Sequence, residues 1–442
     1  MKNITRNGLI ALSLLFCSLN AITVTDLTTE ELVGQLLMVN VQAEEANDAA
    51  RTLINDLHVG GIIYYTWANG LHSADQVAKL STELQNLAAQ TRTQLPLIIA
   101  IDHEGGRVHR FESGLTKFPP AFAYGIINNA TLTKQCAKAM GNELRAVGIT
   151  MNLAPVTDVM SNPNNPIIGT RSFGTTPETV IIHAGAFIEG LHDAGIATSI
   201  KHFPGHGDTA TDSHVALSTI NKSIEELRAC ELKPFYALAD KTDSIMSAHL
   251  LIPALDKNTC STLSPQTLKL LREEANFDGV IITDSLVMKG VMGYAHDDLA
   301  QAAQKAFEAG CDILLIGGRC LVGSVTHESD INDVANVHRT LVSAVNNGTI
   351  KRKRVEESVA RIFALKNHYV LPAPFTPTER ALILDTPEHH LLAFTAAQKA
   401  HAVLNSSNAT YGLTNTVRET FSKQISAIEE LYHENASNTY HR

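Results

Sequence analysis

A short stretch of the chain, residues 201–214, carries an unusual density of reactive side chains. It reads Lys-His-Phe-Pro-Gly-His-Gly-Asp-Thr-Ala-Thr-Asp-Ser-His, with three histidines, two aspartates and one lysine. Burying such groups without partners costs on the order of several kcal/mol, so core packing does not explain this composition. The stretch therefore predicts a functional loop.

Asp212 and His214 lie two residues apart within this loop. An extended backbone places the side chains of such residues on the same side. A carboxylate in contact with an imidazole holds one tautomer and stabilises the protonated ring, so the pair is a candidate for proton transfer. The alternative is a metal site, made of His202, His206, Asp208 and His214. Those spacings match no common zinc pattern.

Asp284 stands at the end of an apolar run, residues 279–284, that reads Gly-Val-Ile-Ile-Thr-Asp. The run predicts a buried strand, which would hold the carboxylate rigidly at its end. A carboxylate in this position can capture an oxocarbenium-like centre as a covalent ester, as a glycosidase requires. The simpler interpretation is a residue that caps the following turn.

Asp102 ends another apolar run and begins the segment Asp-His-Glu-Gly-Gly-Arg-Val-His-Arg-Phe, residues 102–111. Its two glycines permit a sharp turn, and two arginines follow. A carboxylate accepts hydrogen bonds from sugar hydroxyls, and a guanidinium adds planar donors. The segment is therefore a candidate binding loop, and the simpler interpretation is an Asp–Arg pair that only fixes the loop.

Eight apolar runs, including the two above, must position these residues. They span residues 35–41, 60–65, 95–102, 149–154, 197–202, 244–250, 279–284 and 312–317. Most are continuous rather than alternating, as expected for parallel strands covered on both faces. Helix-start signals lie between them at Ser73, Thr176 and Ser223. The repeat predicts an α/β fold, a (β/α)8 TIM barrel, with a doubly wound sheet as the alternative.

A barrel of this kind places its chemistry at the carboxyl ends of its strands. Polar residues lie at or just after several of the expected strands: Asp102, Asp158, Lys201 with His202, His249 and Asp284. A single aspartate there means little, because caps and turns use Asp routinely. Their recurrence along the chain indicates a polar pocket at the barrel mouth.

Three segments are expected along the chain. Residues 1–21 carry Lys2 and Arg6, then an apolar run at residues 9–19 and a small residue for cleavage. This is the order of a signal peptide, so we expect a periplasmic or secreted protein with no membrane partner beyond export. Residues 22–370 are expected to form the barrel.

Residues 371–442 are expected to form a linker and a short, mainly helical C-terminal extension. Prolines mark the linker, and residues 387–404 predict one helix. A second helix has one apolar face, made of Val417, Phe421, Ile425, Ile428 and Leu431. The role of this extension cannot be read from the pattern.

The composition narrows the possible partners. The chain has 442 residues, 44% of them hydrophobic, with 45 acidic and 35 basic side chains and a formal net charge of −10. A mildly acidic chain gives no reason to expect nucleic acid or an anionic membrane as a partner. The sequence contains no glycine-rich phosphate loop and no cysteine pair at metal spacing. We therefore expect no cofactor and no metal, and a monomer.

Four segments together resemble the signatures of glycoside hydrolase family 3. They lie at residues 102–111, 171–174, 201–214 and 282–285. More closely, they resemble its β-N-acetylglucosaminidases (β-N-acetylhexosaminidases) of bacterial cell-wall recycling. The match runs in order over roughly residues 26–365.

The resemblance implies a retaining exo-β-N-acetylhexosaminidase that removes terminal β-linked N-acetylglucosamine from a small carbohydrate, with peptidoglycan fragments as the first choice. Asp284 would form the covalent glycosyl intermediate. His214, oriented by Asp212, would act as acid and then as base. The residues expected to bind the sugar are Asp102, Arg110, Arg171, Lys201 and His202.

Some features depart from the family pattern or leave other activities open. His103 stands where relatives often carry glutamine, which makes it a candidate for tuning specificity. A metal-dependent amidohydrolase is the first alternative activity, and it predicts loss of activity on chelation. A phosphorylase on the same scaffold is the second, and it predicts turnover that depends on phosphate.

Overall fold

The computed structural model describes residues 22–210, 217–322, 325–369, 373–406 and 411–439. Eight parallel strands form its main sheet, in the spatial order β10-β1-β2-β3-β4-β5-β7-β9. Their bounds are β1 Leu37–Val39, β2 Gly61–Tyr64, β3 Ile98–Ile101, β4 Met151–Asn152, β5 Ala197–Phe203, β7 Ser244–Ser247, β9 Val280–Thr283 and β10 Leu314–Ile316. Every residue of these strands is buried, which explains why most of their sequences are continuous apolar runs. Each lies where the sequence predicts a strand.

The two ends of this strand order are joined to each other. Ile282 and Ile313 form a parallel bridge between β9 and the residue that precedes β10. The backbone N–H of Thr283 donates to the carbonyl of Ile313 at 3.0 Å, and that of Leu286 donates to Leu315 at 2.9 Å. The sheet thus closes, which confirms the (β/α)8 barrel over the doubly wound alternative.

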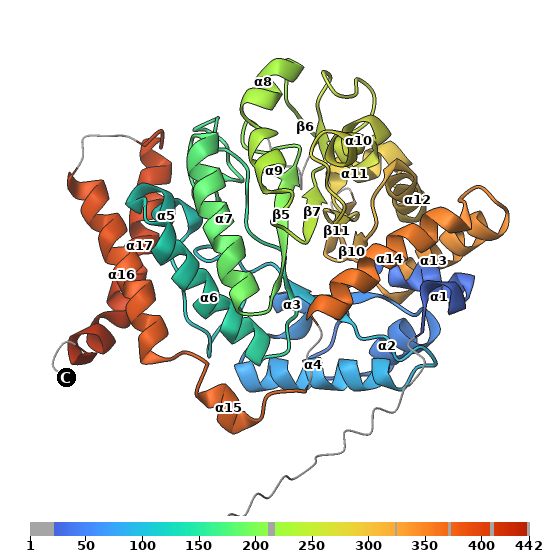
Figure 1. Ribbon diagram of the computed structural model, residues 1–442, viewed down its shortest axis with the longest axis horizontal. Coiled ribbons are helices and arrows are strands. Elements are labelled where there is room, and N and C mark those ends of the chain that lie inside the picture. Colours follow the sequence, from blue (N-terminus) through green and yellow to red (C-terminus); the bar gives the residue numbers. More distant parts are fainter. Residues whose placement is uncertain (1–21, 211–216, 323–324, 370–372, 407–410, 440–442) are drawn as a thin grey trace, which may run out of the picture.

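Helices surround the barrel (Figure 1). Their bounds are α1 Thr29–Gln35, α2 Asp48–Arg51, α3 Thr66–Asn69, α4 Ala74–Ala89, α5 Ala121–Ile127, α6 Ala130–Ala146, α7 Pro177–Asp193, α8 Ile224–Ala229, α9 Lys233–Leu238, α10 Pro265–Glu273, α11 Lys289–Met292, α12 Leu299–Ala309, α13 Ile331–Asn346 and α14 Arg352–Tyr369. The predicted starts are confirmed, because the side chains of Ser73, Thr176 and Ser223 cap α4, α7 and α8.

Two small sheets accompany the barrel. β6 (Ser218–Thr219) pairs with β8 (Leu250–Leu251) in parallel, and β11 (Arg319–Val322) pairs with β12 (Val325–Glu328) in antiparallel orientation. No helix within the described residues is both long and apolar enough to cross a bilayer.

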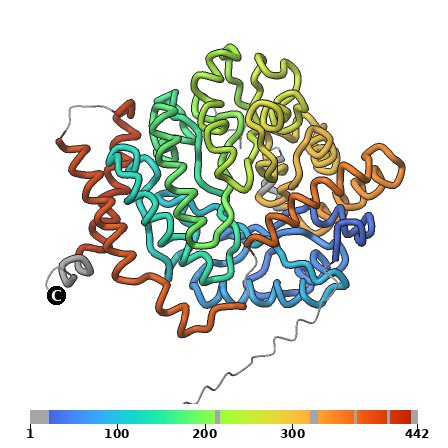
Figure 2. Tube along the Cα trace, viewed as in Figure 1, coloured from blue at the N-terminus to red at the C-terminus, as the bar shows by residue number. Residues whose placement is uncertain are grey.

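The C-terminal extension is helical, as predicted, with α15 (Pro377–Ala381), α16 (Pro387–Ser406) and α17 (Asn415–Thr439). In Figures 1 and 2, α16 and α17 lie side by side against the flank of the barrel that carries α5 and α6. The prediction that Leu431 belongs to the apolar face of α17 is wrong, because this residue is 52% exposed. Tyr432 is buried instead, and its hydroxyl accepts a hydrogen bond from the backbone N–H of Lys117 at 2.7 Å.

Candidate active site

A cavity of about 640 Å³ lies at the carboxyl ends of the barrel strands. Among the residues that line it are Asp102, Arg110, Arg171, Lys201, His202 and Asp284. The structure therefore brings these six expected site residues together from segments that are far apart in sequence. Asp212 and His214, the expected proton-transfer pair, lie outside the described residues.

The cavity floor contains a network of paired charges. The Lys201 ammonium lies 2.6 Å from Asp102 Oδ1 and 2.8 Å from Glu104 Oε1. The Arg171 guanidinium donates two hydrogen bonds to the Glu104 carboxylate, at 2.8 and 2.7 Å. Arg110 donates from Nε to the backbone carbonyl of Asp102 at 3.2 Å. Two cations and two carboxylates are thus fixed relative to one another before any ligand enters.

Pairing keeps these buried groups charged. Burial alone would raise the pKa of the Glu104 carboxyl, but the charges of Arg171 and Lys201 outweigh it and hold that pKa well below its ordinary value. Burial alone would lower the pKa of Lys201, but Asp102 and Glu104 raise it above its ordinary value. The floor therefore presents full charges, and their hydrogen bonds are strong.

Glu104 reaches this network because the chain turns sharply after it. Gly105 and Gly106 both have positive φ, at 87° and 55°. A Cβ atom on Gly106 would lie 2.6 Å from the Cβ of Pro120, so only glycine fits against that segment. The backbone N–H of Glu104 donates to the carbonyl of Val108 at 2.9 Å, which closes the turn.

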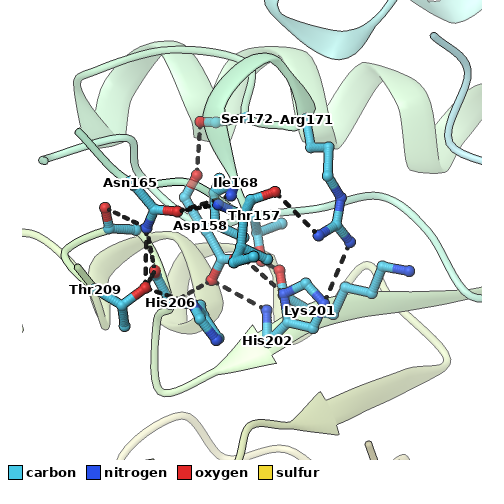
Figure 3. A network of polar contacts seen from close by, with 12 residues as sticks. Thr157, Asp158, Asn165, Ile168, Arg171, Ser172, Lys201, His202, His206 and Thr209 are labelled. Atoms are coloured by element: carbon cyan, nitrogen blue, oxygen red, sulfur yellow. Dashed lines mark hydrogen bonds and ion pairs between the residues drawn. The ribbon is translucent and has the colours of Figure 1, made fainter. Parts of the chain in front are cut away.

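His202 is oriented by a fully buried aspartate, Asp158 (Figure 3). Asp158 accepts hydrogen bonds from His202 Nδ1 at 2.7 Å and from the backbone N–H groups of His202 and His206 at 3.1 and 2.6 Å. Arg171 Nη2 lies 3.4 Å from His202 Nε2. Because Arg171 can only donate, the network assigns the ring proton to Nδ1 and leaves Nε2 as an acceptor.

Asp158 and His206 are both buried, and both have lowered pKa values. Burial would raise the pKa of Asp158, but its contacts with His202 and His206 hold that pKa below its ordinary value. Burial lowers the pKa of His206 to about 4, so this ring is neutral near pH 7. Asp158 was noted in the sequence only as a strand-end residue, and the structure gives it this orienting role.

Asn165 joins the loop after β4 to the loop after β5. Its side-chain Nδ2 donates to the carbonyls of His206 and Gly207 at 2.8 and 3.0 Å. Its Oδ1 accepts from the backbone N–H groups of Ile167 and Ile168, each at 2.8 Å. One buried amide thus supports both the segment that leads to Arg171 and the segment that follows His202 (Figure 3).

Asp284 directly follows β9 and lines the cavity wall. Its Oδ1 accepts a hydrogen bond from the backbone N–H of Ser285 at 2.7 Å. The carbonyl of Ser285 lies 2.8 Å from Nε2 of His249, and the Ser285 hydroxyl donates to the carbonyl of Gly317. His249 is fully buried, so this strand-end histidine supports the backbone behind Asp284 rather than lining the cavity.

Part of the cavity wall is apolar and aromatic. Tyr65 and Trp67 stack with ring centroids 5.3 Å apart and planes 17° from parallel. Met246, Val287 and Met288 also line the cavity. An apolar surface beside a charged floor suits a ligand with one polar and one apolar face.

Sequence reasoning missed two prominent members of the cavity. Glu104 lies in the same segment as Asp102, and its signal is a second carboxylate just before the paired glycines. Trp67 is the only tryptophan of the chain and follows a predicted strand by two residues. His103, the candidate for tuning specificity, does not line the cavity. Its ring packs against the rings of His109 and Phe111, with centroids 4.6 and 5.9 Å apart.

The described residues contain no group of three or more His, Cys, Asp or Glu side chains arranged to hold a metal ion. Two members of the alternative metal site are already engaged. His202 Nδ1 faces Asp158, and His206 Nδ1 lies 2.9 Å from the hydroxyl of Thr209. His214, the remaining histidine of that alternative, lies outside the described residues.

Comparison with known proteins places this architecture in a family. The model of the glycosyl hydrolase family 3 N-terminal domain matches residues 28–365. A β-hexosaminidase of Idiomarina loihiensis is 36% identical over 284 residues, which cover 63% of this chain and 83% of the relative. A β-hexosaminidase of Methylococcus capsulatus is 42% identical over 262 residues, which cover 58% and 75%.

A solved structure supports the same assignment. The family 3 β-N-acetylglucosaminidase from Paenibacillus sp. superimposes with a TM-score of 0.77 and 39% sequence identity. The similarity covers 85% of this chain and 69% of that chain.

Proposed function

This chain belongs to glycosyl hydrolase family 3, and from that membership we propose that it removes terminal β-linked N-acetylglucosamine by a retaining, two-step mechanism. The chain is a glycoside hydrolase of the β-N-acetylhexosaminidase type, and its substrate is a carbohydrate. The finer proposal concerns the residues that act, the order of the steps and the natural substrate.

The position of Asp284 carries the proposal. Its carboxylate lies at a strand end on the wall of the cavity whose floor holds Asp102, Glu104 and Lys201. A backbone N–H fixes one of its oxygens. A carboxylate held next to a charged, hydroxyl-binding floor is suited to attack the anomeric carbon of a sugar bound there.

In the first step, the Asp284 carboxylate forms a bond to the anomeric carbon while the glycosidic C–O bond breaks. The leaving oxygen takes a proton from His214, which Asp212 orients. In the second step, a water molecule gives a proton to His214 and attacks the same carbon. The ester bond to Asp284 then breaks, and the sugar leaves with its original β configuration.

The floor would bind the terminal sugar through its hydroxyl groups. Asp102 and Glu104 accept hydrogen bonds, whereas Arg110, Arg171 and Lys201 donate them. We further propose peptidoglycan-derived GlcNAc–(anhydro)MurNAc fragments as the natural substrate. The support for this is the resemblance to cell-wall-recycling enzymes, and the support for export is the signal-like order of residues 1–21.

The first experiment is release of p-nitrophenol from its β-N-acetylglucosaminide by protein that begins at residue 22. We expect turnover in the wild type and a loss of at least about a thousandfold in Asp284→Ala. Asp278→Ala is the matched control, since Asp278 is an exposed carboxylate that precedes the same strand. Turnover that survives in Asp284→Ala would remove Asp284 from the mechanism.

The alternatives have distinct outcomes in the same assay. A metal-dependent amidohydrolase would release no p-nitrophenol and would instead release acetate in a reaction that EDTA stops, and dependence of turnover on inorganic phosphate would support the phosphorylase. We expect neither. A comparison of kcat/KM for a GlcNAc–anhydroMurNAc fragment and for chitobiose then tests the natural substrate, and equal values would remove the preference for peptidoglycan.

A further inference from the structure

The C-terminal hairpin of α16 and α17 lies beyond residue 365, where the match to the family domain ends. It nevertheless packs closely on the barrel (Figures 1 and 2). Phe421 and Ile425 of α17 are fully buried, and the Phe421 ring meets the ring of Phe122 on α5 edge-on, with centroids 5.5 Å apart. The hairpin is therefore an integral part of the fold and has contacts that can be traced toward the cavity.

One contact leads from α17 to Glu104. The hydroxyl of Tyr432 accepts a hydrogen bond from the backbone N–H of Lys117 at 2.7 Å. The next residue, Phe118, accepts a hydrogen bond from the backbone N–H of Gly106 at 2.9 Å. Gly106 belongs to the turn that places Glu104 on the cavity floor. Tyr432 thus holds the segment against which that turn rests.

A second contact leads from α17 to Arg171. The hydroxyl of Thr170 donates to Gln424 Oε1 at 3.3 Å. Thr170 precedes Arg171 in the short 3-10 helix Gly169–Arg171. Arg171 is the partner of Glu104, so α17 contacts the immediate supports of both members of this ion pair.

A buried carboxylate strengthens the attachment of the extension. Glu143 on α6 accepts hydrogen bonds from the backbone N–H and the hydroxyl of Thr116, both at 2.8 Å. The same carboxylate lies 2.7 Å from His389 Nδ1 and accepts from the backbone N–H of Asp385 at 2.9 Å. The Lys117 segment and the start of α16 are therefore held by one group.

We propose that α17 positions the Glu104–Arg171 pair for sugar binding, with Tyr432 and Gln424 as positioning residues that act without touching the sugar. The inference concerns residues outside the family domain and rests on the proposed function only for its readout. A displacement of either support by a fraction of an ångström misaligns donors that must meet fixed hydroxyls. The extension then contributes to substrate affinity as well as to stability.

The test uses the full chain from residue 22 with Tyr432→Phe, Gln424→Leu and Thr170→Val. Tyr432→Phe removes the acceptor of the Lys117 N–H and keeps the buried ring. We expect KM for the p-nitrophenyl substrate to rise about threefold to tenfold in each variant, with kcat within about twofold of wild type. Leu431→Ala is the matched control, because this side chain of α17 is exposed.

A double variant separates positioning from general loosening. If Thr170 and Gln424 act through one contact, Thr170→Val with Gln424→Leu raises KM no further than either change alone. Variants with a lowered melting temperature but wild-type KM would overturn the proposal and leave α17 a purely stabilising element.

The proposed function can fail separately. If the wild type hydrolyses none of the substrates, the proposed activity is wrong. Calorimetric titration of N-acetylglucosamine into wild type and variants then measures sugar affinity directly and tests the positioning role without relying on turnover. Equal affinities in wild type, Tyr432→Phe and Gln424→Leu would then overturn the inference.

Discussion

The guanidinium of Arg171 meets the carboxylate of Glu104 with two parallel hydrogen bonds, 2.8 and 2.7 Å long, in the cavity floor. The same carboxylate lies 2.8 Å from the Lys201 ammonium. Planar, two-pronged pairing fixes the orientation of both groups as well as their distance. The donors that remain for a sugar therefore point in directions set by the protein.

Glu104→Gln should weaken sugar binding and stability together. The amide retains the shape but leaves Arg171 without its charged partner, and breaking such a buried pair costs about 3–5 kcal/mol. We expect KM to rise at least about tenfold and the melting temperature to fall. Glu112→Gln in the same loop is the control, because Glu112 is exposed. A Glu104→Gln variant with wild-type KM would mean that the pair only stabilises the fold.

Asp158→Asn should disturb the orientation of His202. The amide cannot accept from His202 Nδ1 and from two backbone N–H groups as a carboxylate does. Losing a charged hydrogen bond costs about 1.5–3 kcal/mol, so we expect kcat/KM to fall roughly 10- to 100-fold. Asp240→Asn is the exposed control. Unchanged kcat/KM with p-nitrophenyl β-N-acetylglucosaminide would contradict a role for the Asp158–His202 pair.

Glu231 is the buried partner of Lys222, and Lys222 joins the two sides of residues 211–216 through its contact with Asp208. Glu231 is fully buried and lies 2.5 Å from the Lys222 ammonium, which is also 3.4 Å from Asp208. The segment between Asp208 and Lys222 carries Asp212 and His214, the proposed acid–base pair. We expect Glu231→Gln to lower kcat/KM about tenfold for a substrate with a poor leaving group.

The leaving group makes this prediction sharp. A dinitrophenyl group departs without protonation, so its kcat/KM, which reports the first step, should change little in Glu231→Gln, whereas kcat/KM for a disaccharide should fall. Glu225→Gln, at an exposed position, is the control. Equal losses for good and poor leaving groups would show that Glu231 does not act through the proton donor.

Lys366 should make stability depend on pH. It is buried on α14 with its ammonium 2.6 Å from Gln35 Oε1, and burial lowers its pKa to about 7 from an ordinary value of 10.5. Between these values the unfolded chain holds a proton that the folded chain has lost. The contribution of Lys366 to the free energy of unfolding therefore increases as the pH rises between these two values, by at most about 1.4 kcal/mol per pH unit.

Denaturant titrations between about pH 6 and pH 10 measure this effect. Lys366→Met should remove a contribution that rises above pH 7, so the wild type gains stability relative to the variant as the pH increases. Lys353→Met, at an exposed position on the same helix, should follow the wild type. Parallel curves for wild type and Lys366→Met would contradict the lowered pKa.

The barrel and much of the cavity could be predicted because the relevant signals are local. Most of the buried strands are continuous apolar runs, and Asp102, Lys201 and Asp284 lie in or directly after predicted strands. Which side chains contact each other, in contrast, is not encoded in neighbouring residues of the sequence. Nothing near Glu104 indicates that it meets Arg171, and nothing near His249 indicates that it lies behind Ser285, because the pairings depend on where strands come together.

The C-terminal helices illustrate the same limit. Helical periodicity predicts that Phe421, Ile425 and Ile428 share a buried face, and the structure places them there. Helical periodicity alone does not decide whether Leu431 or Tyr432 is buried, because positions three and four residues after Ile428 both lie close to that face. Tyr432 is buried because its hydroxyl finds the Lys117 N–H, a contact between residues distant in sequence.

The closure of the barrel determines when the protein can fold during synthesis. β1 pairs with β10 as well as with β2, so one edge of β1 stays unpaired until β10, the last strand of the barrel, has been synthesised. Until β10 leaves the ribosome, the nascent sheet has two unpaired edges, and such edges can pair with other chains. Pairing of strands this far apart in sequence is also slow. We expect chaperones to bind the nascent chain chiefly before β10 is complete.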